Sequence, residues 1–123
     1  MKLPEGHQRV IPYLILQNAV AFFDFTKAVF DAEERHRSYQ EDQRTLRHGE
    51  IRIGDATIMF GQSSDTWATE NAGLYIYVED ADVTFQKALD AGATVVMPVA
   101  DQSYGRSGGV KDPFGNTWWI TAV

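Results

Sequence analysis

An internal repeat constrains the fold of this chain more than any other feature. Residues 74-LYIYVEDA-81 resemble 12-PYLILQNA-19, and 87-KALDA-91 matches 27-KAVFDA-32 in register at its first positions and loosely after them. The repeat is about sixty residues long, and its second copy is slightly eroded. A chain of 123 residues with 44% apolar content fits one ordinary domain. We therefore predict a single domain over residues 1–123, with one module at about 8–61, a linker at about 62–73 and a second module at about 74–123.

Hydrophobic periodicity predicts that both copies begin with a strand and a helix and continue with further strands. Apolar or alternating runs bounded by turn residues are typical of strands, and aromatics at helical spacing are typical of a helix. In the first copy we expect strands at 10–16, 33–40, 45–53 and 56–60, and a helix at 19–31 that Asn18 would cap. In the second we expect strands at 74–78, 94–99 and 117–122, a helical segment at 87–91 and a glycine-rich connection at 101–109.

Three features of the chain point to a known family when they occur together. They are the duplicated β-α-β-β-β pattern, the segment 48-HGEIRIGD-55 and the terminal motif 112-DPFGNTWWI-120. In these features the chain resembles the glyoxalase, bleomycin-resistance and extradiol-dioxygenase family, the vicinal oxygen chelate superfamily. The resemblance implies an α+β fold of two βαβββ modules, with an open, curled, mixed sheet around a ligand cavity and helices outside. It also implies a homodimer, because many relatives form their sites at or near a subunit interface.

The resemblance also implies where a metal ion would be held. Many enzymes of the family bind a divalent metal on four strand positions, which correspond here to Ile11, Met59, Gly73 and Trp119. Ile58 is the alternative for the second position. Hard cations need oxygen ligands, and zinc or nickel needs imidazole, carboxylate or thiolate. None of these side chains supplies such a group, so we expect neither the usual metal nor another cofactor.

Strand alternation separates the side chains that face the helices from those that face the cavity. Trp118 shares a face with Ile120 and is expected to pack under the helices, whereas the adjacent Trp119 points the other way. The same alternation separates His48, Glu50 and Arg52 from Ile51 and Ile53. An inner face of aromatics with a few polar groups is typical of a small-molecule pocket. The predicted ligand-binding residues are Tyr13, His48, Glu50, Met59, Trp67, Tyr75, Tyr77, Tyr104 and Trp119.

Four residues with chemically distinctive side chains lie outside the predicted strands. Trp67 is in the polar linker, where it could form a lid over the cavity, contact a second subunit or simply be a surface aromatic. Tyr104 is in the glycine-rich connection. His7 is expected to be solvated in an N-terminal arm. Asp112 is expected to shape its Asp-Pro-Phe-Gly turn, with its carboxylate accepting backbone N–H bonds.

Two histidines suggest a second kind of site. A hairpin centred near Asp42 would place His36 opposite His48, with Glu34 and Glu50 on the same face. Such a cluster is consistent with an unusual metal site or with acid–base catalysis. A histidine pair on a half-solvated hairpin is equally consistent with no chemistry at all.

The composition excludes several partners. The chain has no cysteine, so disulfides and thiolate metal sites are excluded. A net charge of −6 leaves no basic face for a nucleic acid. No run approaches the ~20 apolar residues of a membrane span, and the start MKLPEGHQR lacks the apolar stretch of a secretion signal. We therefore expect a cytoplasmic protein without nucleic-acid or membrane partners.

Two functional classes remain for this chain. The first is a metal-independent protein that binds or sequesters a planar aromatic compound such as an antibiotic, as the bleomycin-resistance branch implies. The acidic net charge would favour a cationic ligand and cation–π contacts. The second is a lyase, isomerase or glyoxalase-type enzyme, with an atypical metal site or with His48 and Glu50 as an acid–base pair. The first class is the prediction, and no catalytic residue is assigned.

Overall fold

The computed structural model describes residues 1–123, which divide into two compact units, Met1–Asn71 and Ala72–Val123. The first unit contains β1 (Tyr13–Leu16), α1 (Val20–Phe30), β2 (Glu33–Tyr39), β3 (Leu46–Ile53) and β4 (Ala56–Gln62). The second contains β5 (Gly73–Tyr77), α2 (Ala81–Asp90), β6 (Thr94–Gln102), β7 (Gly105–Lys111) and β8 (Thr117–Ala122). Both units have the order β-α-β-β-β, which confirms the predicted α+β fold of two βαβββ modules.

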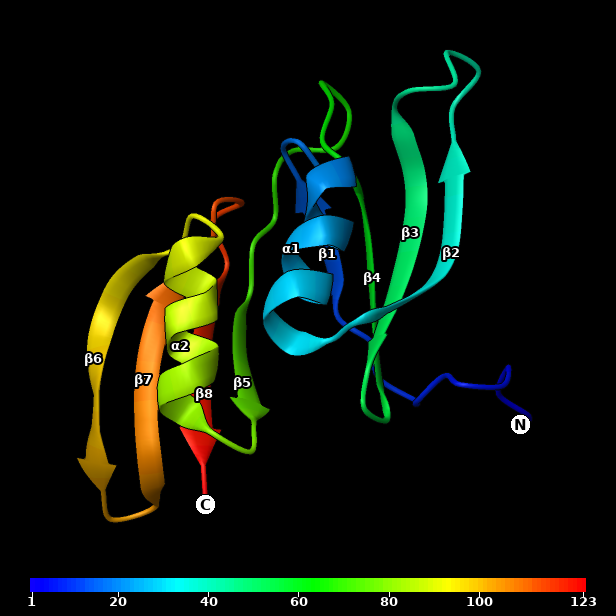
Figure 1. The fold of residues 1–123 in the computed structure, drawn as a ribbon. Coiled ribbons are helices and arrows are strands. Elements are labelled where there is room, and N and C mark those ends of the chain that lie inside the picture. The colour runs from blue at the N-terminus through cyan, green and yellow to red at the C-terminus, as the bar shows by residue number, and fades with distance from the viewer. The chain divides into compact units, whose positions relative to one another are not determined.

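Each unit forms one four-stranded mixed sheet (Figure 1). The strand orders are β1-β4-β3-β2 in the first unit and β5-β8-β7-β6 in the second. The first and last strands of each unit pair in parallel, with Tyr13 opposite Met59 and Tyr75 opposite Trp119. The remaining pairs are antiparallel. The internal repeat in the sequence therefore corresponds to two sheets of the same topology.

The glycine-rich segment of the second unit is a strand, so its prediction as a connection is wrong. β6 continues to Gln102, and β7 begins at Gly105. The glycines are needed because large side chains lie directly over the strand. A Cβ atom on Gly108 would lie 3.0 Å from the Phe85 ring of α2, and one on Gly109 would lie 2.6 Å from the Trp119 ring. Gly108 and Gly109 lower the strand propensity of the segment, but they allow the Phe85 and Trp119 rings to pack against it.

Helix α1 does not start as predicted. Asn18 has a left-handed backbone conformation with φ 53°, and the N-cap residue is Ala19, which has no capping side chain. The Ala19 amide instead donates to Oε1 of Gln62 over 2.9 Å. Helix α2, by contrast, begins after Asp80, whose side chain accepts from the Val83 amide. The Gln62 side chain at the end of β4 therefore accepts a hydrogen bond from a backbone amide at the start of α1, a role that was expected of Asn18.

The core of the first unit is aromatic. Phe22 and Phe23 of α1 contact Phe60 of β4 edge to face, with ring centroids 4.9 and 4.8 Å apart. Gly49 of β3 leaves room for them, since a Cβ atom there would lie 2.7 Å from the Phe23 ring. Helix α1 therefore covers the face of the sheet that contains Gly49 and Phe60.

The prediction that Trp118 packs beneath the helix of the second unit is confirmed. This side chain is 1% exposed, and Ile120 on the same face of β8 is fully buried. Gly108, which packs against α2, lies opposite Ile120 in the register of β7 and β8. Trp118 thus lies on the face of the sheet that α2 covers, and Trp119 lies on the other face.

Asp112 shapes the turn before β8, as predicted. Its buried carboxylate accepts from the amides of Phe114 and Asn116, from the Asn116 side chain and from Nε1 of Trp118, over 2.8–3.0 Å. The residue that follows Phe114, Gly115, has φ 98°, a conformation that favours glycine. Asp112 thus joins the turn to the buried tryptophan.

Candidate functional site

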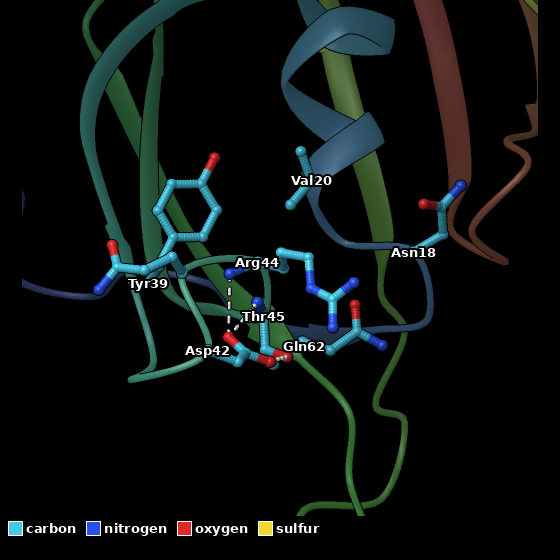
Figure 2. A pocket seen from close by; sticks show the side chains of 8 residues that line it. Asn18, Val20, Tyr39, Asp42, Arg44, Thr45 and Gln62 are labelled. Atoms are coloured by element: carbon cyan, nitrogen blue, oxygen red, sulfur yellow. Dashed lines mark hydrogen bonds between the residues drawn. The ribbon is translucent and has the colours of Figure 1, made fainter.

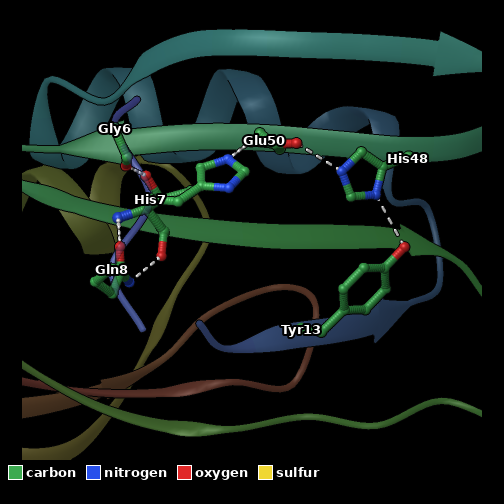
Figure 3. A network of polar contacts seen from close by, with 7 residues as sticks. Gly6, His7, Gln8, Tyr13, His48 and Glu50 are labelled. Atoms are coloured by element: carbon green, nitrogen blue, oxygen red, sulfur yellow. Dashed lines mark hydrogen bonds and ion pairs between the residues drawn. The ribbon is translucent and has the colours of Figure 1, made fainter. Parts of the chain in front are cut away.

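A chain of polar contacts crosses the face of the first sheet that points away from α1 (Figure 3). The Tyr13 hydroxyl lies 3.0 Å from Nδ1 of His48, and Nε2 of His48 lies 2.8 Å from Oε2 of Glu50. The other oxygen of Glu50, Oε1, lies 2.7 Å from Nε2 of His7. Tyr13 is on β1, and His48 and Glu50 alternate along β3, so strand periodicity accounts for their common face. Met59 lies next to both Tyr13 and Glu50 in the strand register.

The N-terminal segment that contains His7 is bound to the sheet, so the prediction that His7 is solvated is wrong. Gln8 donates from its side-chain amide to the carbonyl of Thr57 and accepts from the Thr57 backbone amide, over 2.8 and 3.1 Å. The Thr57 hydroxyl donates to the carbonyl of Gly6 over 2.5 Å. Because β1 begins only at Tyr13, the Gln8 side chain takes the place of a paired strand residue beside Thr57.

Burial and hydrogen bonds set the protonation of this network. Burial raises the pKa of the Glu50 carboxyl, but the hydrogen bonds from His48 and His7 outweigh it, so the pKa lies below its ordinary value. Burial, and secondarily the nearby Glu50 carboxylate, raise the pKa of the Tyr13 hydroxyl. Near neutral pH, Glu50 is therefore ionised and Tyr13 carries its proton.

The predicted pairing of His36 with His48 is wrong by two residues of the register. His36 lies opposite Glu50, and Ser38 lies opposite His48, because β2 and β3 shift register at two places. The two imidazoles still approach each other, with ring centroids 5.6 Å apart. Glu34 does not join them: it pairs with Arg37, which lies over the Phe23 ring on the helix side.

The side chains at the four positions of the family's metal do not fit a metal ion. Ile11 precedes β1, Gly73 begins β5, and Met59 and Trp119 present a thioether and an indole. Ile58 is buried among the core residues, which favours Met59 over Ile58 for the second position. No group of three or more His, Cys, Asp or Glu side chains is placed to hold a metal ion. At these four positions the hard cations and zinc or nickel therefore lack the ligands that they prefer.

The second unit presents an aromatic surface on the face away from α2. The Tyr75 and Tyr77 rings contact each other at 5.4 Å between centroids and are 52% and 67% exposed. Tyr75 lies opposite Trp119, whose ring packs over the backbone of Gly109. The strand parity predicted for these three side chains agrees with this register.

The two loop aromatics among the predicted residues are both exposed. Trp67 is 65% exposed, and its amide donates to the hydroxyl of Ser64. Tyr104 is 53% exposed in the turn between β6 and β7. Beyond that turn, Arg106 pairs with Asp82 and Asp101, which was not anticipated. The structure thus brings four predicted residues together in the first unit and three in the second, and leaves Trp67 and Tyr104 apart.

Two cavities of the first unit lie elsewhere. The larger, about 610 Å³, lies between the start of α1 and the β2–β3 turn and is lined by Asn18, Val20, Tyr39, Asp42, Gln43, Arg44, Thr45 and Gln62 (Figure 2). The hydrogen bond from the Thr45 hydroxyl, with two backbone amides, lowers the pKa of Asp42 to about 2. The smaller, about 310 Å³, is bounded by α1 and the start of β2. None of the nine predicted residues lines either cavity.

The fold and the sheet faces define a protein of two βαβββ modules with the first and last strand of each module in parallel. The chain belongs to the Glyoxalase/Bleomycin resistance protein/Dioxygenase superfamily, whose model matches residues 14–120. This confirms the family expected from the repeat and the terminal motif. None of the helices is long and apolar enough to cross a membrane.

Individual relatives agree with this assignment. A protein of Mycobacterium bovis, described as uncharacterized, is 38% identical over 120 residues, which cover 87% of this chain and 78% of that protein. The crystal structure of TioX from Micromonospora sp. ML1 matches with a TM-score of 0.73 at 23% identity, over 94% of this chain and 96% of that one. The fosfomycin resistance protein FosX from Mesorhizobium loti matches with a TM-score of 0.69 at 18% identity, over 97% and 92%. At these identities the two solved structures show a shared fold.

Proposed function

We propose that this chain binds a planar aromatic small molecule, such as an antibiotic, without the help of a metal ion. The observation that carries the proposal is the chemistry of the sheet faces away from the helices. Where the family's enzymes hold a metal, this chain has Met59 and Trp119, flanked in register by Tyr13 and Tyr75. Aromatic rings and a thioether bind flat, apolar surfaces well and divalent cations poorly.

The charge and the relatives support the same proposal. The net charge of −6 attracts cations, and cations bind favourably over tyrosine and tryptophan rings. One structural neighbour is a fosfomycin resistance protein, so this fold serves resistance to an antibiotic in another chain. A role in sequestering or presenting a toxic compound is therefore the function that we propose, in the cytoplasm and without nucleic-acid or membrane partners.

Titration with a panel of planar, cationic aromatic compounds tests this function. At least one compound is expected to quench the tryptophan fluorescence of the protein saturably, with an affinity that persists in excess chelator. Tyr75→Ala is expected to weaken that affinity about tenfold, because a contact between an aromatic ring and a cation contributes on the order of 1 kcal/mol or more. Val83→Ala, which trims a side chain 50% exposed on α2, is the matched control and should bind as the parent does. Affinity that vanishes in chelator, or equal binding by Tyr75→Ala, would contradict the proposal.

Acid–base catalysis is the second candidate function. The contact of 2.8 Å between His48 and Glu50 favours it, because a carboxylate that orients an imidazole is a common arrangement for a general base. Turnover of a ligand from the panel, abolished by His48→Phe and retained in chelator, would favour catalysis over binding alone. Turnover that required stoichiometric zinc, nickel or manganese would indicate the atypical metal site.

A homodimer is proposed together with this function. The resemblance to the family implies it, and the edge strand β6 presents Val95 and Val96, which are 51% and 47% exposed. Apolar side chains on a sheet edge are commonly covered by association. Sedimentation is expected to give twice the chain mass of 13.8 kDa at micromolar concentration. A monomer at high micromolar concentration would contradict this expectation.

A further inference from the structure

The direction of each hydrogen bond in the Tyr13–Glu50 network follows from the ionised carboxylate. An ionised carboxylate only accepts hydrogen bonds, so the Nε2 atoms of His48 and His7 both donate to Glu50. A neutral His48 with its proton on Nε2 has a lone pair on Nδ1, and the Tyr13 hydroxyl must donate to it. This tautomer is assigned from the hydrogen-bond network. Glu50 thereby fixes His48 as an acceptor on the side that faces Tyr13.

Exposure decreases along the same chain of contacts. Tyr13 is 47% exposed, and the side chains of His48 and Glu50 are 25% and 15% exposed. A ligand can therefore reach the junction of Tyr13 and His48, whereas Glu50 lies behind it. The Tyr13 hydroxyl can rotate toward a new acceptor, but the His48 ring is held by Glu50. The junction thus offers one adjustable donor beside one fixed acceptor.

We propose that Tyr13 and His48 form a donor–acceptor pair that selects a planar aromatic ligand carrying adjacent carbonyl and hydroxyl groups. The Tyr13 hydroxyl donates to the ligand carbonyl, and the ligand hydroxyl donates to Nδ1 of His48. This inference rests on the proposed function, because it names the chemical class of the ligand for one of the two sheet faces proposed there, the face of the first unit that carries Tyr13 and Met59.

The geometry of the pair matches that class of ligand. Oη of Tyr13 and Nδ1 of His48 are 3.0 Å apart, and the two oxygens of an ortho-hydroxy aromatic ketone are separated by a similar distance, about 2.5–3.0 Å. Such a ligand exchanges two hydrogen bonds, the one between Tyr13 and His48 and its own internal bond from hydroxyl to carbonyl, for two bonds to the protein, and it leaves no polar group at the junction unpaired. A ketone without the hydroxyl would break the bond between Tyr13 and His48 and leave Nδ1 without a donor. Glu50 already accepts from two imidazoles, so it is a weaker anchor for a ligand than the Tyr13–His48 pair.

Three neutral probes test the inference: 1-hydroxy-2-acetonaphthone, its 1-methoxy ether and 2-acetonaphthone. Isothermal titration of the parent protein is expected to show the hydroxy ketone binding at least about tenfold more tightly than the other two, since an unpaired polar group at a site built for a hydroxyl is costly. Tyr13→Phe and His48→Phe should each reduce that ratio to about twofold or less, with little loss of affinity for 2-acetonaphthone. Tyr39→Phe, which removes a hydrogen-bonded hydroxyl from another strand of the same unit, is the matched control and should keep the parent ratio.

Each outcome decides between the two proposals. Equal affinity of the parent for all three probes would overturn the donor–acceptor pair and leave aromatic binding intact. Absence of binding by all three, together with a negative cationic panel, would overturn both. A preference that survives Tyr13→Phe would place the selective contact elsewhere and overturn the pair. Should a variant fail to fold, ¹H–¹⁵N spectra of the parent imidazoles still decide, because a proton on Nδ1 rather than Nε2 of His48 contradicts the assigned acceptor.

Discussion

Trp118→Ala is expected to lower the free energy of unfolding by about 3–5 kcal/mol, and Trp119→Ala by less than half as much. Trp118 is 1% exposed, so its removal leaves a cavity beneath α2 and deprives Asp112 of a donor. Trp119 lies on the other face of β8, where its loss opens a surface and leaves no sealed cavity. The effect of Trp119→Ala should instead appear as weaker binding of planar aromatics.

Denaturant melts of the two variants measure this difference. Trp67→Ala is the matched control, because Trp67 is 65% exposed and its hydrogen bonds to Ser64 involve only the backbone of residue 67. It should change the free energy of unfolding by about 0.5 kcal/mol or less. Equal destabilisation by Trp118→Ala and Trp119→Ala would mean that the two faces of β8 are assigned the wrong way round.

Asp112→Asn is expected to destabilise the protein by about 3 kcal/mol, although the side chains have nearly the same shape. The carboxylate accepts four hydrogen bonds, two of them from Asn116 Nδ2 and Trp118 Nε1 to the same oxygen. An amide must replace one oxygen by an NH₂ group, so in either orientation buried donors face a donor. The loss of about 1–3 kcal/mol for each unsatisfied buried group accounts for the expected size.

The control for Asp112→Asn is Asp90→Asn, at an exposed carboxylate that accepts only from the side chain of Gln86 in the same helix. This control should change the free energy of unfolding by about 0.5 kcal/mol or less. A melt of Asp112→Asn that matched the control would show that the turn before β8 does not depend on the carboxylate. Near-ultraviolet circular dichroism should report the loss of fixed geometry around Trp118.

The parts of the fold that follow from local periodicity could be predicted from the sequence. Alternation along β8 separates Trp118 from Trp119, and alternation along β3 places His48 and Glu50 on one face. The repeat predicted that the second unit begins with a strand and a helix, as the first unit does. Strand β7 was not predicted because glycines are uncommon in strands. Its glycines make room for the Phe85 ring at Gly108 and the Trp119 ring at Gly109, and such contacts between distant residues leave no pattern in the local sequence.

The site was predictable only where its residues lie on regular strands. His7 reaches Glu50 across 43 positions from a segment without regular structure, so no periodicity predicts the contact. The register of β2 on β3 shifts at two places, as it does at bulges, and the shift between Ser38 and Tyr39 lies between the turn and the pair of His36 with Glu50. Bulges depend on how side chains pack across the sheet, and spacing about a turn residue does not reveal them. Strand alternation placed His48 and Tyr13 on the same side of the sheet. Which nitrogen of His48 carries the proton follows only from its contact with Glu50, which the structure shows.

The attachment of residues 6–8 to the first sheet affects how samples of this protein should be prepared. His7 contacts Glu50, and Gln8 is bonded to Thr57, so a peptide fused ahead of Met1 would be joined to the segment that supplies His7 to the Tyr13–Glu50 network. A polyhistidine tag in that place would bring imidazoles that compete with His7 for the carboxylate and would carry metal from the affinity column. Val123, at the other end of the chain, is 96% exposed. Metal analyses and titrations are therefore best done with a tag fused after Val123, or with the tag removed.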